Sequence, residues 1–256
     1  MRIGTTPNPR LEIIEEIKSI SRLKFDFVEL SIGNWILSKK KVLIETKNLE
    51  LGLTGHLPDI DLCNPNPKKN RELLQRFIES IDIFHELGIG KVVAHAFVGR
   101  EVDVSKHPDN MIKDLKLQML KELTHRCQNS NIKLCLENTE EKPEDLTMFF
   151  EELPSLYFCL DIGHANLFTE ENTSKDFIEK FQHRLRHIHI SDNFGGYSEK
   201  HDRHLPLGTG KIDFKTILRY LKEIGYNDTF TLEVFSRYKE YADVSKKILR
   251  RLWDEV

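Results

Sequence analysis

The stretch Lys133–His164, KLCLENTEEKPEDLTMFFEELPSLYFCLDIGH, contains the pattern that decides the fold. Two short, largely apolar runs, Lys133–Glu137 and Tyr157–Asp161, have the length and composition of buried strands. Between them, Pro143–Glu152 has the spacing of an amphipathic helix, and Pro143 suits its first turn. A strand, a helix and a second strand in this order predict two parallel strands joined by a crossover helix.

The same alternation extends along the rest of the sequence. The strand candidates are Arg2–Thr5, Phe25–Leu30, Gly52–Gly55, Lys91–His95, Lys133–Glu137, Tyr157–Asp161, Arg186–Ile190 and Thr229–Val234. The helical segments between them include Leu11–Leu23, Asn70–Leu87, Asp109–Asn129, Pro143–Glu152, Phe214–Ile224 and Tyr241–Trp253. No glycine-rich dinucleotide turn follows the first strand, which disfavours a doubly wound sheet. The pattern therefore predicts an α/β protein, a (β/α)8 TIM barrel forming a single domain over residues 1–256.

Composition disfavours several classes of protein. The 38 Lys and Arg residues against 41 Asp and Glu give a net charge of −3, which argues against a surface built mainly to bind polyanions. No stretch approaches the roughly eighteen apolar residues that span a bilayer, and residues 1–10 lack the apolar core of a signal peptide. The cysteines form no CxxC pair and are expected to be reduced and buried. We expect a cytoplasmic protein without a membrane partner, and the sequence does not indicate its oligomeric state.

Histidines and carboxylates stand at or just after the ends of the later predicted strands. These residues are His56, His95, Glu137, Asp161, His164, His189 and Glu233, and the loop after the seventh strand adds Asp202, Arg203 and His204. In a barrel, the carboxyl ends of the strands converge on one face, where active sites lie. We therefore expect these side chains to meet there.

Three of these residues are carboxylates within apolar runs. Glu137, Asp161 and Glu233 would repel one another when buried unless a cation compensates their charge. Ion pairs with buried Arg or Lys are the alternative, but the strand ends supply few basic residues. Imidazole and carboxylate ligands suit Zn²⁺, Mn²⁺ or a related divalent ion, and no thiolate is among the candidates. The sequence therefore predicts a divalent metal site.

Other residues near the predicted site are assigned more simply. Because side chains alternate along a strand, we expect His189 to face the interior and His187 to point outward or to act as a hydrogen-bond donor behind the site. Trp35, just after the second strand, either walls the mouth of the barrel or packs on a helix. We expect the remaining histidines at the surface: His85, His107, His125, His183 and His201.

Five segments carry a resemblance to a known family. They are LEN at Leu136–Asn138, DIGHA at Asp161–Ala165, HIHISD at His187–Asp192, DRHLPLGTGKIDF at Asp202–Phe214 and LEV at Leu232–Val234. With the strand pattern, they resemble the xylose isomerase-like TIM barrels, which include sugar isomerases and epimerases as well as apurinic endonucleases of the endonuclease IV type. The resemblance covers nearly the whole chain.

The sugar isomerase and epimerase branch implies one metal ion, held by Glu137, Asp161, His189 and Glu233. It also implies that Glu137 and Glu233 transfer protons through an enediolate of a sugar or sugar phosphate. His164 would bind a substrate oxygen, and His56, His95 and Arg203 are further candidates for substrate binding. This chemistry is the favoured interpretation.

The endonuclease IV branch is the alternative, and it implies up to three zinc ions that hydrolyse a phosphodiester of DNA. The matching ligands would be His56, His95, Glu137, Asp161, His164, His189, Asp202, His204 and Glu233. The nuclease pattern resembles DTCH and HLND, whereas this chain has DIGH and HISD. The loops of this chain also offer few basic residues to bind a DNA duplex. A dehydratase, a lyase or a binding protein on the same scaffold would be further possibilities.

Overall fold

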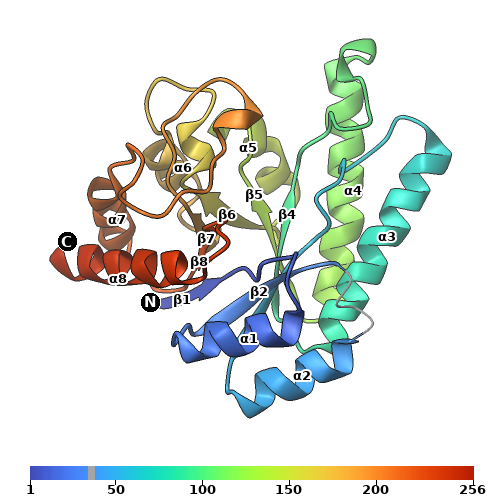
Figure 1. Cartoon of the computed structure of the whole chain (residues 1–256). Helices are drawn as coiled ribbons and strands as arrows, with labels where there is room; N and C mark the ends of the chain where they lie inside the picture. The colour runs from blue at the N-terminus through green and yellow to red at the C-terminus, as the bar shows by residue number, and fades with distance from the viewer. Residues whose placement is uncertain (34–37) are drawn as a thin grey trace.

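The computed structural model describes residues 1–33 and 38–256, and Trp35 lies outside the described residues. The chain forms a closed barrel of parallel strands that follow one another in sequence order (Figure 1). The strands are β1 (Arg2–Thr5), β2 (Phe27–Ser31), β3 (Gly52–His56), β4 (Lys91–His95), β5 (Lys133–Glu137), β6 (Tyr157–Asp161), β7 (Leu185–Ile190) and β8 (Thr229–Leu232). The predicted (β/α)8 barrel is confirmed.

Helices separate the strands in the described part of the chain. They are α1 (Ile13–Arg22), α2 (Lys39–Asn48), α3 (Pro67–Glu86), α4 (Asp109–Asn129), α5 (Pro143–Glu152), α6 (Ser174–Phe181), α7 (Phe214–Glu223) and α8 (Glu240–Glu255). The bounds of α4 and α5 agree with the sequence prediction, and those of the other predicted helices differ by one to three residues. None of the described helices is long and apolar enough to cross a membrane.

The apolar core lies between the strands and the surrounding helices. Phe84 of α3, for example, is fully buried, and a Cβ added to Gly55 of β3 would lie 3.0 Å from its ring. A side chain at position 55 would therefore push α3 away from the sheet. The four cysteines are buried and free, as predicted.

The register between strands determines which residues are neighbours at the carboxyl ends of the strands. His95 of β4 lies beside Glu137 of β5, and Asp161 of β6 lies beside His189 of β7. Because the strands are parallel, these four side chains leave the sheet at one rim of the barrel.

The barrel closes where its first and last strands pair. Thr5 of β1 lies beside Leu232 of β8, and its hydroxyl donates to the Leu232 carbonyl at 2.8 Å. Glu233 follows directly, so closure of this seam brings it to the same rim.

Candidate metal centre

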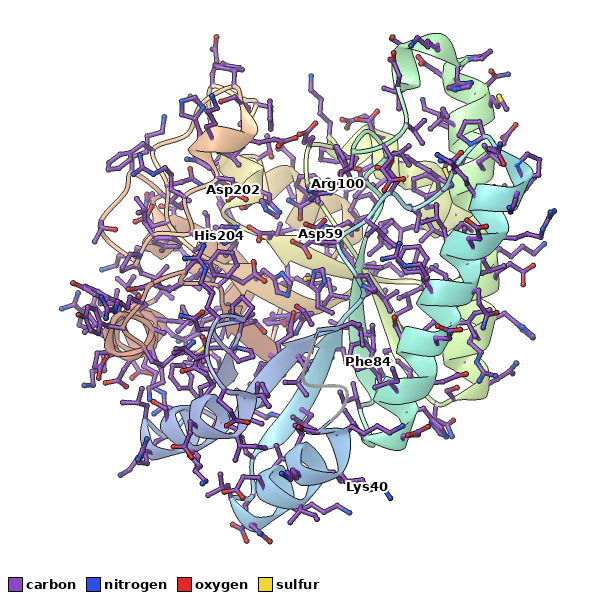
Figure 2. All side chains as sticks on the ribbon, turned by 45° about the vertical axis from the view of Figure 1, so that its right-hand side comes forward. Lys40, Asp59, Phe84, Arg100, Asp202 and His204 are labelled. Atoms are coloured by element: carbon purple, nitrogen blue, oxygen red, sulfur yellow. The ribbon has the colours of Figure 1, made fainter. Side chains whose placement is uncertain are left out.

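The carboxyl ends of the strands open into a cavity of about 750 Å³. Figure 2 shows Asp202 and His204 on the side of the last strands, and Asp59 and Arg100 on the side of β3 and β4. All four residues line the cavity. A concave site of this size accommodates a small molecule.

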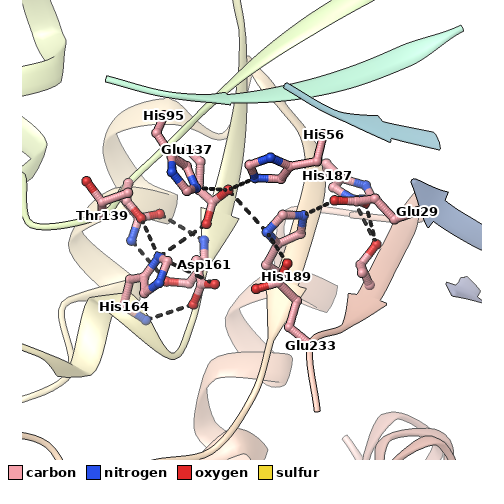
Figure 3. A network of polar contacts seen from close by, with 12 residues as sticks. Glu29, His56, His95, Glu137, Thr139, Asp161, His164, His187, His189 and Glu233 are labelled. Atoms are coloured by element: carbon pink, nitrogen blue, oxygen red, sulfur yellow. Dashed lines mark hydrogen bonds and ion pairs between the residues drawn. The ribbon is translucent and has the colours of Figure 1, made fainter. Parts of the chain in front are cut away.

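Glu137 lies at the centre of a cluster of imidazoles (Figure 3). Its Oε2 lies 3.4 Å from Nε2 of His56, 3.2 Å from Nε2 of His95 and 3.2 Å from Nδ1 of His189. Its Oε1 lies 3.2 Å from Nδ1 of His164. Four predicted site histidines therefore surround one fully buried carboxylate.

A second carboxylate, Glu233, approaches the same ring. Its Oε1 lies 3.4 Å from Nδ1 of His189, the nitrogen that also faces Glu137. Asp161 joins from β6, where its Oδ2 lies 3.5 Å from Nδ1 of His164. The four residues predicted to hold a single ion are thus parts of one buried network.

The loop after β7 contributes a third group to this network. Asp202 Oδ2 lies 2.9 Å from Nε2 of His204 and 3.3 Å from Nε2 of His164. His204 also places its Nδ1 3.6 Å from Oε2 of Glu233. The structure thereby brings together every member of the predicted nine-residue set, and their binding of a metal stays a prediction.

Close approach of two loops explains the glycine in the DIGH motif. A Cβ on Gly163 would lie 2.6 Å from Oγ of Ser191 and 3.1 Å from Oδ1 of Asp161. The same Oδ1 accepts a hydrogen bond from the backbone N–H of His164 at 2.7 Å. The Asn138 side chain pairs with both backbone groups of Asp161, at 2.8 and 2.9 Å. These contacts fix where Asp161 and His164 point.

Asp192 organises the GTGKI turn that follows the HLP segment. Its carboxylate accepts backbone hydrogen bonds from Asn193, Gly208, Gly210 and Ile212. A Cβ on Gly210 would lie 2.3 Å from Asp192 Oδ1, so the turn closes tightly around this carboxylate. This arrangement holds the loop that carries Asp202 and His204.

Arg203 is not brought to the site. Its side chain is exposed, and the described residues that line the cavity include Asp202 and His204 but not Arg203. Because the side chains of Asp202 and His204 meet each other, the intervening residue points away. Arg100 lines the cavity instead, with its Nη2 2.5 Å from Oδ2 of Asp59.

His187 does not point outward, and it lies behind the site, the second of its two expected positions. Residues two apart lie on the same face of a strand, so His187 and His189 both point into the barrel and are both fully buried. Each contacts Glu29 of β2, through Nε2 of His187 at 2.8 Å and Nε2 of His189 at 2.9 Å. Glu29 is a buried carboxylate that the sequence analysis missed. Its signal was one acidic residue within the apolar run FVEL.

The carboxylates shift the protonation of the imidazoles. Burial alone would lower the pKa of His95, but Glu137 and Asp59 raise it to about 10. In the same way, Asp161, Asp202 and Glu137 outweigh burial and raise the pKa of His164 well above its usual range. Protonated imidazoles therefore supply the positive charge that the buried carboxylates require in the metal-free chain.

The contacts among these residues leave buried ligand atoms unsatisfied, and a cation would satisfy them. The buried atoms Glu137 Oε1, Asp161 Oδ2, Asp202 Oδ1 and His189 Nδ1 have no hydrogen-bond partner among the described residues. In the described part of the chain, the ion pairs of these carboxylates are all with histidines, so Lys and Arg do not compensate them. The ligand atoms of His56, His95 and Glu137, like those of His164, Asp202 and His204, lie within 4.8 Å of one another. Nitrogen and oxygen donors of this kind suit a divalent transition ion or zinc.

Comparisons with known proteins agree with this architecture. The family model described as "Xylose isomerase-like TIM barrel" matches residues 17–252. A crystal structure of a D-tagatose 3-epimerase-like protein superposes with a TM-score of 0.86 and 25% identity, covering 100% of this chain and 98% of the other.

Two of the sequence relatives are named for different activities. An L-ribulose 3-epimerase of Methylomonas sp. is 24% identical over 93% of this chain and 85% of its own length. A probable endonuclease 4 of Aster yellows witches'-broom phytoplasma is 27% identical over 70% of this chain and 66% of its own length. The family match spans nearly every strand and helix of the barrel, and the chain belongs to the xylose isomerase-like TIM barrel family.

Proposed function

We propose that this protein is a divalent-metal-dependent epimerase of an unphosphorylated sugar, with Glu137 and Glu233 as the proton-transfer pair. The observation that carries the proposal is that both carboxylates approach one nitrogen, Nδ1 of His189. Glu233 lines the cavity, and Glu137 lies directly behind the lining residues His56, His95 and His164. Inversion at a carbon beside a carbonyl requires a base on one face and an acid on the other. Two buried carboxyl groups beside one ligand pocket can divide these roles.

The residues have distinct tasks in this reaction. One glutamate removes the proton from the carbon beside the sugar carbonyl, and the other glutamate returns a proton to the opposite face. The two carboxyl groups exchange protonation states in each turnover. A divalent ion held by Glu137, Asp161, His189 and Glu233 supplies the Lewis acidity that polarises the carbonyl. His164, which lines the cavity, binds a substrate hydroxyl.

Charges around the mouth favour a neutral substrate. The cavity lining includes the carboxylates of Glu12, Asp59, Glu140 and Glu199 near the rim. Among the described lining residues, Arg100 is the one Arg or Lys, and it is paired with Asp59. A phosphate group would meet net negative charge there. The named activities of the similar epimerases, on tagatose and ribulose, agree with this preference.

The test is turnover of free ketoses in D₂O. Purified protein with Mn²⁺ is incubated with D-tagatose, with L-ribulose or with a ketose phosphate, and the products are analysed by NMR and mass spectrometry. We expect the C3 epimer of a free ketose, with one deuterium at C3, and much less product from the phosphate. Glu137→Gln should abolish formation of the C3 epimer, because one of the two proton-transfer groups is then lost, and full epimerisation by this variant would contradict the role of Glu137 in proton transfer.

An abasic-site endonuclease is the second candidate, because all nine residues of the nuclease ligand pattern meet in one network. It predicts about three zinc ions per chain and metal-dependent incision of a duplex with one abasic site. The acidic rim disfavours a polyanionic substrate. Incision of the duplex without exchange at any ketose would reverse the order of the two candidates.

A further inference from the structure

Four histidines of the centre are anchored through the same ring nitrogen. In three of them, Nδ1 donates to a backbone carbonyl. His56 donates to Leu57 at 2.7 Å, His164 to Asn138 at 3.0 Å, and His204 to Glu233 at 3.1 Å. A carbonyl oxygen can only accept, so Nδ1 of these rings carries the hydrogen. His95 follows the same pattern, with Nδ1 3.2 Å from Asp59. In all four rings, Nε2 faces a carboxylate of the cluster.

His189 is oriented the other way round. Its Nδ1 faces Glu137 and Glu233, at 3.2 and 3.4 Å, and its Nε2 points down into the barrel. Nε2 lies at ion-pair distance, 2.9 Å, from Oε1 of Glu29, and neither atom has a hydrogen-bond partner among the described residues. Glu29 is therefore the group available to anchor this ring from behind (Figure 3).

Other buried groups hold Glu29 itself in place. Its Oε2 accepts hydrogen bonds from the hydroxyls of Thr54 at 3.0 Å and Thr231 at 2.8 Å, and lies 2.8 Å from Nε2 of His187. These contacts all involve one carboxylate oxygen, which leaves Oε1 directed at His189. The carboxylate is fully buried and fixed by β3, β7 and β8 together.

We propose that Glu29 is a positioning residue, which accepts the Nε2–H of His189 and thereby presents Nδ1 of that ring as the metal-binding nitrogen. The inference rests on the proposed cation centre and adds a residue outside the predicted ligand set. A carboxylate behind a ligating imidazole fixes the tautomer and the ring orientation and makes the other nitrogen a better donor. It assigns to β2, which carries none of the predicted ligands, a part in the site.

The first test measures Mn²⁺ binding to the full-length protein after removal of metal by chelation. Electron paramagnetic resonance reports free Mn²⁺ directly, so that no turnover is needed. We expect Glu29→Gln to weaken Mn²⁺ binding about 10- to 100-fold, the range typical for loss of such a partner. Thr231→Val, which removes one hydrogen bond to Glu29, should weaken it by a smaller factor.

Glu16→Gln is the matched control. Glu16 of α1 is also a buried carboxylate, and it pairs with Lys239 at 3.3 Å rather than with a histidine of the centre. The same substitution there removes a buried charge and lowers stability without touching His189. We expect wild-type affinity for Mn²⁺, which separates positioning from a general loss of packing.

The second test needs no variant of Glu29. Long-range ¹H–¹⁵N spectra of the Zn²⁺-loaded wild-type protein distinguish protonated from metal-bound ring nitrogens, with the signals assigned by single histidine substitutions. We expect His189 to carry its hydrogen on Nε2 with Nδ1 bound to the metal, whereas His56 carries its hydrogen on Nδ1. A spectrum with Nε2 of His189 bound to the metal would overturn the proposal, even if Glu29→Gln does not fold.

The outcomes separate the two proposals. If the wild-type protein binds neither Mn²⁺ nor Zn²⁺, the cation centre itself is wrong and the role of Glu29 falls with it. If wild type and Glu29→Gln bind Mn²⁺ equally, the positioning role alone is overturned. Weaker binding in Glu29→Gln, with unchanged binding in Glu16→Gln, supports both.

Discussion

Position 163 requires glycine, because Ser191 and Asp161 occupy the space where a Cβ would lie. We expect Gly163→Ala to lower the free energy of unfolding by about 1–3 kcal/mol, the usual cost of overpacking. Urea denaturation measures this change. Ser191→Ala in the same chain removes the atom that lies 2.6 Å away and should restore part of the loss.

Gly90 provides the control for that substitution. A Cβ there would meet no atom within 4 Å, and the residue has no left-handed backbone conformation. Gly90→Ala should change stability by no more than about 0.5 kcal/mol, as expected for a surface position. Equal losses in Gly90→Ala and Gly163→Ala would show that the close approach at Gly163 has no energetic consequence.

Single residues also show where sequence analysis succeeds and where it stops. Glu137 and Asp161 end apolar runs, so their position at the rim follows from the strand pattern alone. Glu29 was missed because its partners, His187 and Thr231, are 158 and 202 residues away along the chain. The outward alternative for His187 was wrong because alternation was applied to residues two apart, which share a face. Arg203 was selected by residue type, and its direction depends on a loop that no periodic pattern describes.

The loop after β4 depends on one carboxylate. Both oxygens of Asp61 accept backbone hydrogen bonds, from Gly99 and Arg100 at 2.8 Å and from Glu101 and Val102 at 2.8 and 3.0 Å. Although burial alone would raise the pKa of Asp61, these four donors hold it below the usual value of 3.8. The charge on Asp61 therefore stabilises the loop that places Arg100 in the cavity lining.

A pH profile tests this role of Asp61. Because its pKa is lower in the folded chain, its contribution is complete above the unfolded value, near pH 4, and is lost as the pH falls through the folded value. Asp61→Asn should cost about 1–3 kcal/mol at neutral pH, the range for leaving buried donors poorly satisfied. The difference between wild type and variant should shrink as the pH falls below about 4. The role of Asp61 would be contradicted if the loss of stability in Asp61→Asn did not depend on pH. It would also be contradicted if Asp103→Asn, a substitution of an exposed residue in the same loop, lowered stability equally.

The loop that carries Asp202 and His204 is held by the carboxylate of Asp192. Asp192→Ala leaves the N–H groups of Gly208, Gly210 and Ile212 without this acceptor. We expect faster tryptic cleavage in native protein, after Lys200 and Lys211, because cleavage requires local opening. Thr209→Ala changes the same turn without removing a hydrogen bond to Asp192, so this variant should be cleaved at the wild-type rate. Equal cleavage rates in wild type, Asp192→Ala and Thr209→Ala would refute the role of Asp192.

Helices differ in how clearly the sequence delimits them. The helices α4 and α5, whose buried faces include several apolar side chains, were placed with the observed bounds. In α2, the buried positions are Val42 and Thr46 alone, so the helix has little apolar period to detect. In α6, the pattern extends over eight residues, which is short for a periodic signal. The strand count still fixed the fold, because each barrel strand is buried on both faces.

Removal of metal should change the stability of the chain as a unit, because the candidate ligands come from β3 to β8 and the loop after β7. A ligand that binds the folded state alone stabilises it by about 2.7 kcal/mol at 100 times its dissociation constant. We expect EDTA treatment to lower Tm by several degrees and Mn²⁺ to restore it. Mg²⁺, which prefers oxygen ligands, should restore less. Calorimetry with the same Tm in all three conditions would exclude a cation from the native fold.

The pairing of β1 with β8 has a consequence for synthesis on the ribosome. Arg2 and Thr229 are neighbours in the barrel although they are 227 positions apart in the sequence, so the cylinder cannot close until β8 has emerged. A nascent chain arrested before β8 exposes the unpaired edges of β1 and β7, which invite pairing with other chains. It also lacks Glu233. Such products are therefore prone to aggregate and unable to build the full cation site, so uptake of the ion reports that β8 has been made and has paired with β1.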